Sequence, residues 1–149
     1  MKKIACLLFT AIIIFTITGS TFAQGKLGVV GKIYTKTEAN SLYGSVLQSV
    51  NIDTKVLKSA LDRVGDYVMF KIKDGKLVLT NEYKASLTSE YVNITSDETM
   101  YLYSKSKVLE LLNSSGQPVT TVELRSEVLT ITNGATTLEF AALCPPICP

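Results

Sequence analysis

The chain has 149 residues and a formal net charge of +2, from 15 Lys and Arg against 13 Asp and Glu, and it contains no histidine. This length predicts one compact domain with a modest core. The near-neutral charge argues against nucleic acid as a partner. Without histidine, Ser-His-Asp and Cys-His catalysis and His-ligated zinc are excluded, and we predict no cofactor and no metal site.

The N-terminal segment has the layout of a secretory signal peptide spanning residues 1–23. Lys2 and Lys3 precede an apolar run, 4–18, and small residues lead to a predicted cleavage site after Ala23. We therefore predict an exported protein, periplasmic or extracellular, with no membrane insertion of the mature chain. The alternative is an uncleaved membrane anchor, because the apolar segment is long enough to span a bilayer.

The mature domain, assigned to residues 24–140, begins with a helix signal. Thr35 and Glu38 have the spacing of a capping box, in which a Thr N-cap is followed three residues later by Glu. Gly44 is a natural end for this helix. We expect an extended segment, 46–52, after it, and one longer helix through Gly44 is the alternative.

A second helix is predicted from Asp53 or Thr54 to Gly65, and the clearest hairpin of the chain follows it. Asp74-Gly75 supplies the positive φ angles that a two-residue turn needs. Counting outward from this turn gives the register Ile72–Leu77 and Phe70–Leu79. One face of the helix carries Val56, Leu57, Ala60, Leu61 and Val64. The inner face of the hairpin carries Val68, Phe70, Ile72, Leu77 and Leu79.

The second half of the domain repeats these signals. A strand at 99–103 precedes a third helix, capped by Ser104 or Ser106. A strand at 119–125 leads into a second hairpin, which turns at Asn133-Gly134. The inner face of this hairpin is predicted to carry Leu129, Ile131, Leu138 and Phe140.

Together these elements predict an α+β fold. We expect a small single domain in which an antiparallel sheet built from hairpins carries two or three short helices on one face. The stretches YTKT at 34–37 and YSKS at 103–106 each open a helix, and a hairpin follows in each half, after one extra short helix in the first half. Two related halves are therefore an option. Residues 141–149 are assigned to a Cys- and Pro-rich C-terminal tail.

Two weak patterns are compatible with catalysis. Ser104 and Lys107 have the S-x-x-K spacing, in which a lysine one helical turn away activates a serine. Glu90 with Asp97 or Glu98 would make a carboxylate pair of the glycosidase type. The chain lacks the S-D-N and K-T-G elements that accompany S-x-x-K. We therefore interpret Ser104 as a helix cap and assign no catalytic residue.

Surface tyrosines give the better indication of function. Tyr101 and Tyr103 alternate with Met100 and Leu102 along one strand. If Met100 and Leu102 face the core, the two tyrosines form an exposed pair, and Tyr67 lies on the outer face of the first hairpin. Because tyrosine is enriched where proteins bind partners, we predict these three tyrosines as binding residues. The alternative is that a helix or loop covers this face.

The tail contains the two cysteines that would remain after signal cleavage, Cys144 and Cys148, and such a pair indicates a disulfide in an exported protein. A polyproline II tail would separate their Cα atoms by roughly 12 Å, whereas a disulfide allows less than about 7 Å. We therefore predict a tight turn through Pro145-Pro146 and a disulfide within the chain. A bridge between chains, or free or metal-bound thiols, are the alternatives.

These observations favour an exported, non-enzymatic binding or structural module of the cell envelope or the extracellular space. Its partner would be another envelope or extracellular protein, or a second copy of the chain. Two alternatives belong to other classes. One is a small exported hydrolase that uses carboxylates or the Ser/Lys pair, and the other is a cysteine-linked, self-assembling surface subunit.

Overall fold

The computed structural model describes residues 27–88, 92–126, 128–145 and 148. Within these ranges the chain forms three helices and two antiparallel sheets, which confirms a mixed α+β domain. The five-stranded sheet has the order β1-β8-β7-β6-β2, and the four-stranded sheet has the order β4-β3-β5-β9. The strands are β1 (Lys32–Thr35), β2 (Gln48–Asp53), β3 (Tyr67–Lys73), β4 (Lys76–Asn81), β5 (Met100–Ser104), β6 (Val119–Leu124), β7 (Leu129–Asn133), β8 (Thr136–Glu139) and β9 (Ala142–Cys144). The helices are α1 (Lys36–Tyr43), α2 (Thr54–Leu61) and α3 (Lys105–Ser115).

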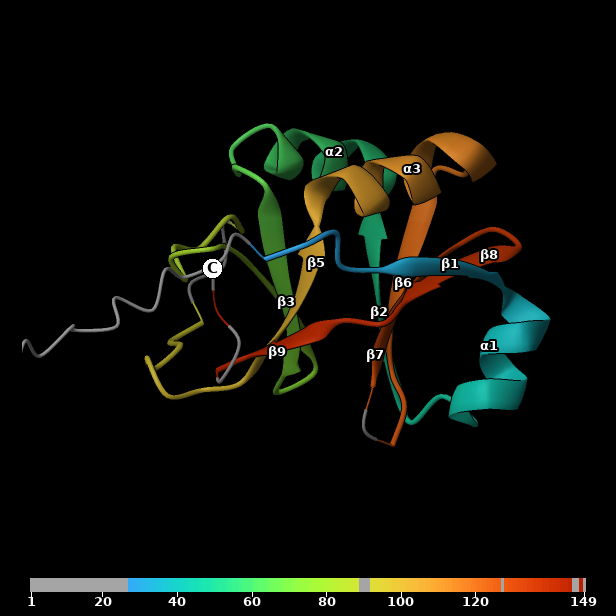
Figure 1. The fold of residues 1–149 in the computed structure, drawn as a ribbon, viewed down its shortest axis with the longest axis horizontal. Helices are drawn as coiled ribbons and strands as arrows, with labels where there is room; N and C mark the ends of the chain where they lie inside the picture. Colours follow the sequence, from blue (N-terminus) through green and yellow to red (C-terminus); the bar gives the residue numbers. More distant parts are fainter. Residues whose placement is uncertain (1–26, 89–91, 127, 146–147, 149) are drawn as a thin grey trace, which may run out of the picture.

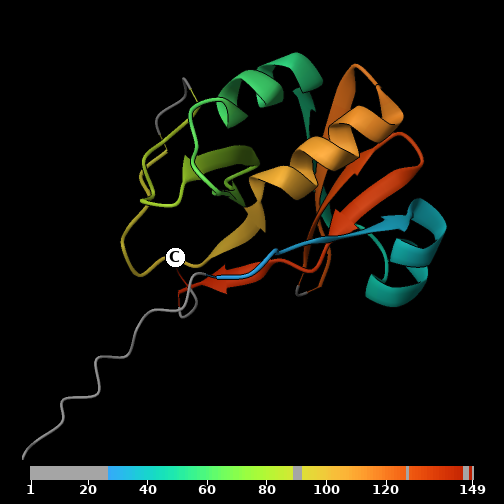
Figure 2. The same ribbon diagram turned by 45° about the horizontal axis from the view of Figure 1, so that its top comes forward.

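Helices α2 and α3 lie side by side over the inner faces of both sheets (Figures 1 and 2). Their apolar residues share one core with Phe70 of the four-stranded sheet and Ile131 of the five-stranded sheet. Helix α1 lies apart from them (Figure 1), against the opposite face of the five-stranded sheet, where the rings of Tyr43 and Tyr34 are 5.9 Å apart. The sequence predicted two or three helices on one face of a single sheet. The structure instead has two sheets, with α2 and α3 over their inner faces and α1 against the outer face of the five-stranded sheet.

The helix starts follow from local capping, as predicted for α1 and α2. Thr35 and Glu38 form the capping box, with the amide of Glu38 donating to Thr35 Oγ1 at 3.2 Å and the amide of Thr35 to Glu38 Oε2 at 2.8 Å. Asp53 Oδ1 accepts from the amides of Lys55 and Val56. Ser104 is the N-cap residue of α3, but its hydroxyl accepts from the amide of Val30 at 2.8 Å and caps nothing.

Both predicted hairpins are present. β3 and β4 turn at Asp74-Gly75 in the predicted register, which pairs Ile72 with Leu77 and Phe70 with Leu79. β7 and β8 turn at Asn133-Gly134. Phe140 is the exception to the predicted inner face, because it is 69 % exposed with a φ of 73°. The chain leaves the five-stranded sheet at this residue and joins the four-stranded sheet as β9.

The outer face of the four-stranded sheet is covered by a second apolar core. Met69, Met100 and Leu102 form its centre, and Val30 from the N-terminal segment packs on them. The amide of Ser104 donates to the carbonyl of Val30 at 3.0 Å, which holds this segment against β5. The centre of the four-stranded sheet is therefore buried on both faces.

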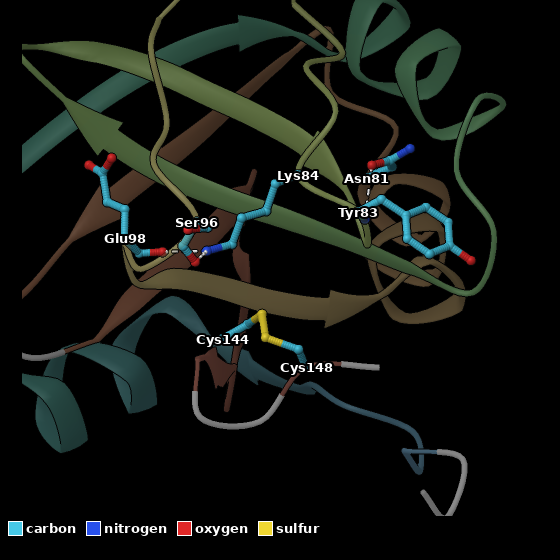
Figure 3. Close-up of a disulfide and its surroundings, with 7 residues drawn as sticks. All are labelled: Asn81, Tyr83, Lys84, Ser96, Glu98, Cys144 and Cys148. Atoms are coloured by element: carbon cyan, nitrogen blue, oxygen red, sulfur yellow. Dashed lines mark hydrogen bonds between the residues drawn. A yellow bond between two sulfur atoms is a disulfide. The ribbon is translucent and has the colours of Figure 1, made fainter.

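The C-terminal residues form a strand and a closed ring. β9 was assigned to the tail in the sequence, but its residues pair with Met100–Leu102 of β5. Cys144 and Cys148 form a disulfide within the chain, with their Cα atoms 4.9 Å apart, which confirms the predicted ring. The Cys144–Pro145 peptide bond is cis. Figure 3 shows the disulfide beside the four-stranded sheet, near the loop that Lys84 holds through the carbonyls of Ser96 and Glu98.

Among the residues that the structure describes, no helix is long and apolar enough to cross a membrane.

Candidate functional site

The three tyrosines predicted to bind a partner are not an exposed group. Tyr103 is fully buried, packs edge to face on Phe70 and donates its hydroxyl to the carbonyl of Leu129. Burial raises the pKa of Tyr103 well above its ordinary value. Tyr67 is buried beneath the N-terminal segment, and Tyr101 is half-buried against the main core. The predicted exposure is wrong for Tyr103 and Tyr67, and the alternative of a covering helix or loop applies to both.

The predicted catalytic patterns do not assemble either. The hydroxyl of Ser104 is occupied by the amide of Val30, and Lys107 Nζ bonds to Glu110 at 2.7 Å. Glu98 is held by ammonium groups at 2.7 Å and 3.0 Å, from Lys71 and Lys73. These hydrogen bonds lower its pKa to about 2 and leave it a structural acid. Glu90, the other half of the predicted carboxylate pair, lies outside the described residues.

A buried polar layer lies on the outer face of the five-stranded sheet, opposite the main core. We use the name polar layer for six side chains that are each at least nine-tenths buried and come from β6, β7, β8 and the residue after β6. The strand register brings them together, because Glu123 pairs with Thr130 and Thr132 pairs with Thr137. The six residues are Glu123, Arg125, Thr130, Thr132, Thr137 and Glu139.

Glu123 is the centre of the polar layer. Its Oε2 accepts from Arg125 at 2.8 Å, from the Thr130 hydroxyl at 3.2 Å and from the Thr132 hydroxyl at 3.1 Å. A hydroxyl has one proton, so Thr132 must accept from Thr137, whose Oγ1 is 3.0 Å away. Arg125 also donates to Thr130 and to the carbonyl of Gly44. The layer is thus a charge-assisted network that fixes one carboxylate oxygen in place.

An open pocket of about 430 Å³ lies between the polar layer and α1, and Glu123 is part of its wall. Lys36 and Asn40 come from one face of α1, because residues four apart in a helix lie above one another. Gly44 and Ser45 close the pocket at the end of the helix. Glu123 is therefore a fixed, largely buried acceptor at the wall of a solvent-connected cavity.

The second carboxylate of the layer, Glu139, lies under α1. It is 3 % exposed, and its Oε2 has no hydrogen-bond partner among the described residues. The hydroxyl of Tyr43 is 3.3 Å from that of Tyr34. Burial, followed by hydrogen bonds to Tyr34 and Glu139, raises the pKa of Tyr43. The Tyr43 hydroxyl keeps its proton and donates to the Tyr34 hydroxyl beside the polar layer.

A larger pocket, of about 560 Å³, lies at the start of α3 and includes Tyr67. Leu27, Val29 and Leu109 make much of its wall. Two of its polar side chains already have internal roles, because Ser104 accepts from the amide of Val30 and Lys105 Nζ donates to the carbonyl of Val64. The pocket beside Glu123 offers a fixed charged group, and we regard it as the candidate site.

None of the binding residues or catalytic candidates predicted from the sequence belongs to the polar layer. The sequence pattern that indicates the polar layer is the alternation of Thr, Glu and Arg with apolar residues along 119–139. This alternation predicts one solvent-exposed face and one apolar face. That pattern gives no sign that α1 folds back over the polar face. The site was missed because its cover is set by tertiary packing.

Taken together, the fold and the site define a small α+β protein with a buried polar layer and an adjoining ligand-sized pocket. In the part of the chain that the structure describes, no group of three or more Cys, Asp or Glu side chains is placed to hold a metal ion. Comparison with known proteins gives no match: no protein-family model, no curated protein and no solved structure matches the chain.

Proposed function

We propose that the protein is an exported, non-enzymatic binding module whose ligand site is the pocket between α1 and the polar layer. The observation that carries the proposal is Glu123, a buried carboxylate fixed by three hydrogen bonds at the wall of an open pocket. Held in this way, the group is ready to accept a hydrogen bond without rearrangement, which reduces the entropic cost of binding.

The energetics of the network support a functional role. A buried ion pair is often no more stabilising than apolar side chains of the same volume. Stability alone therefore does not require Glu123 and Arg125 inside a small domain. A role in recognition explains why a charge is kept at this position.

The pocket's walls indicate the kind of ligand. Glu123 accepts hydrogen bonds on one side, and Lys36 and Asn40 offer donors on the other. A small molecule with a donor group at one end and an acceptor group at the other matches this arrangement. The proposal of export is supported by the signal-peptide pattern and by the disulfide, which is typical of oxidising compartments.

A thermal-shift screen tests the proposed site. We expect some members of a panel of amino acids, monosaccharides and dipeptides to raise the melting temperature of the protein. That effect should disappear in Glu123→Gln, which keeps the side-chain shape and removes the charge. The control is Glu110→Gln, on the exposed side of α3, which should respond like the parent protein. Equal responses in Glu123→Gln and the parent would refute the site.

A carboxylate hydrolase is the second candidate, favoured by one observation. Glu123 and Glu139 lie on the same face of the sheet with only β7 between their strands. The usual strand spacing puts their Cα atoms roughly 10 Å apart. Inverting glycosidases hold their two carboxyl groups about 6.5–9.5 Å apart around a water molecule, so this function requires both side chains to lean toward β7. Hydrolysis of chromogenic glycosides that is lost in both Glu123→Gln and Glu139→Gln would establish this function in place of simple binding.

We also propose that the chain contains two related halves. β2-α2-β3-β4 and β5-α3-β6-β7 have the same order of elements. Buried residues of α2 recur 51 positions later in α3, with Val108 after Leu57 and Leu112 after Leu61 (108 minus 57, 112 minus 61). The pairing is reciprocal, because β2 pairs with β6 and β5 pairs with β3.

A further inference from the structure

We propose that the free edge of β2 binds an extended segment of a protein partner by strand addition. β2 is the last strand of the five-stranded sheet and pairs with β6 on one side. In the part of the chain that the structure describes, no strand pairs with its other side. This site is separate from the pocket beside Glu123 and does not depend on the function proposed for it.

The register shows which backbone groups of β2 are available. The amide of Thr54 donates to the carbonyl of Pro118 at 2.8 Å, in line with the pairing of Ile52 with Thr120. In an antiparallel pair, alternate residues direct both backbone groups to the neighbouring strand. The even-numbered residues of β2 therefore bond to β6, and Ser49 and Asn51 direct their N–H and C=O groups to the free side.

The other sheet edges have features that block strand addition, and among the described residues none of these features protects β2. β1 has four residues and carries Lys32, and β9 has three residues and ends in the disulfide. The edge of β4 is covered by a following segment, in which the amide of Leu87 donates to the carbonyl of Leu79 at 2.8 Å. The stretch QSVNI of β2 has no lysine, arginine or proline. Lysine, proline, short strands and covering segments are the usual protections of an edge.

A groove of about 370 Å³ lies beside this edge, and it is lined by apolar side chains together with Arg63 and Thr88. Its apolar part indicates which partner side chains it can accept. Ile52, Leu79 and Leu87 line it, and its exposed floor is Val56 of α2, which is 59 % exposed. Side chains of a strand point alternately to opposite faces. A strand added to β2 would therefore place every second side chain in the groove, and the partner segment should alternate apolar and polar residues.

The groove also argues against a second copy of β2 as the occupant. In a β2–β2 pair, the side chains facing the groove would be Val50 and Ile52, which already pack against their own core. They cannot fill the groove of a neighbour without leaving that core. The occupant must bring apolar side chains that are free, as an extended segment of another protein does.

A phage-displayed library of random decapeptides, selected on protein produced from the full chain, tests the proposal. We expect the enriched sequences to alternate apolar and polar residues, and a synthetic peptide of the best sequence to serve as the probe. Val56→Lys puts a charge in the groove and should weaken this probe at least tenfold. Leu42→Lys is the matched control, because Leu42 is 60 % exposed on α1, away from β2, and it should bind the probe like the parent protein.

Amide hydrogen exchange separates strand addition from other modes of binding. In the free protein, Ser49 and Asn51 should exchange much faster than Val50 and Ile52, which bond to β6. The probe should slow Ser49 and Asn51 selectively. Equal weakening in Val56→Lys and Leu42→Lys, or slow exchange of Ser49 and Asn51 without the probe, would overturn the proposal. Protection that grows with protein concentration would identify a second copy as the occupant and overturn it as well.

Discussion

The hairpins β3–β4 and β6–β7, one from each sheet, differ in what covers them. Their inner faces are alike, because Phe70 and Leu79 in the first correspond to Val122 and Ile131 in the second, and all four are fully buried. Their outer faces are not alike. The first hairpin places Met69 in a second apolar core, whereas the second hairpin carries the polar layer.

The charged residues show the same contrast. Lys71 and Lys73 correspond in position to Glu123 and Arg125, 52 residues later (123 minus 71, 125 minus 73). The lysines reach across the surface to Glu98, while Glu123 and Arg125 form a pair that is almost completely buried. The inner faces of the two hairpins thus pack into one core, and the hairpins differ in their outer faces.

The largest expected effect comes from breaking the buried pair. Arg125→Ala leaves Glu123 buried without its cation, and we expect a loss of about 3–5 kcal/mol in the free energy of unfolding. Urea denaturation measures this loss. The equivalent change in the first hairpin, Lys73→Ala, removes half of a partly exposed pair and should cost less than about 1 kcal/mol.

A double variant separates the charge from the packing. Replacing both partners with apolar residues, Glu123→Leu with Arg125→Met, removes the buried charges together and should restore most of the stability lost in Arg125→Ala. It should also abolish any ligand response of the pocket. If Arg125→Ala and Lys73→Ala cost the same, the two hairpins would not differ as described.

The second expected effect tests the outer apolar core. Met69 is fully buried against Met100 and Leu102, and Met69→Ala should cost about 2–5 kcal/mol by leaving a cavity. Thr121 holds the equivalent position in the second hairpin and bonds to Asn51 at the exposed surface. Thr121→Ala should cost less than about 1 kcal/mol in the same urea measurement. Similar costs for both would mean that the two outer faces are equally packed.

The sequence was informative where structure depends on neighbours in the chain. Thr35 and Glu38 predicted the first helix start, and Asp74-Gly75 predicted both a turn and its register, because these residues act within a few positions of themselves. The alternation in β6 and β7 also indicated correctly which side chains share a face.

What the sequence could not predict was the cover on each outer face. Tyr103 lies in a strand, MYLYS, whose two faces are both rich in apolar area, and alternation cannot choose between faces when both are buried. For the polar layer, the sequence pattern predicts the wrong exposure. Glu123 and Arg125 have the pattern of a solvent-exposed face, and only the position of α1 shows that this face is covered. Both covers come from segments distant in the sequence, residues 27–30 and α1.

The smallest expected effect concerns the pH dependence of the surface pair. Hydrogen bonds from Lys71 and then Lys73 lower the pKa of Glu98 from 4.5 to about 2. A carboxylate with a lowered pKa stabilises the folded state above its unfolded pKa, and this contribution is lost as the pH falls toward the folded value. Between about pH 5 and about pH 2, the melting temperature should therefore fall more in the parent protein than in Glu98→Gln. Glu110→Gln, which removes a more exposed pair with Lys107, should keep the parent's pH dependence. An identical decline in Glu98→Gln and the parent would contradict this prediction, because it would show that the ion pairs of Glu98 do not contribute to the pH dependence of the melting temperature. The contrast between the hairpins would then depend on the buried pair of Glu123 and Arg125 alone.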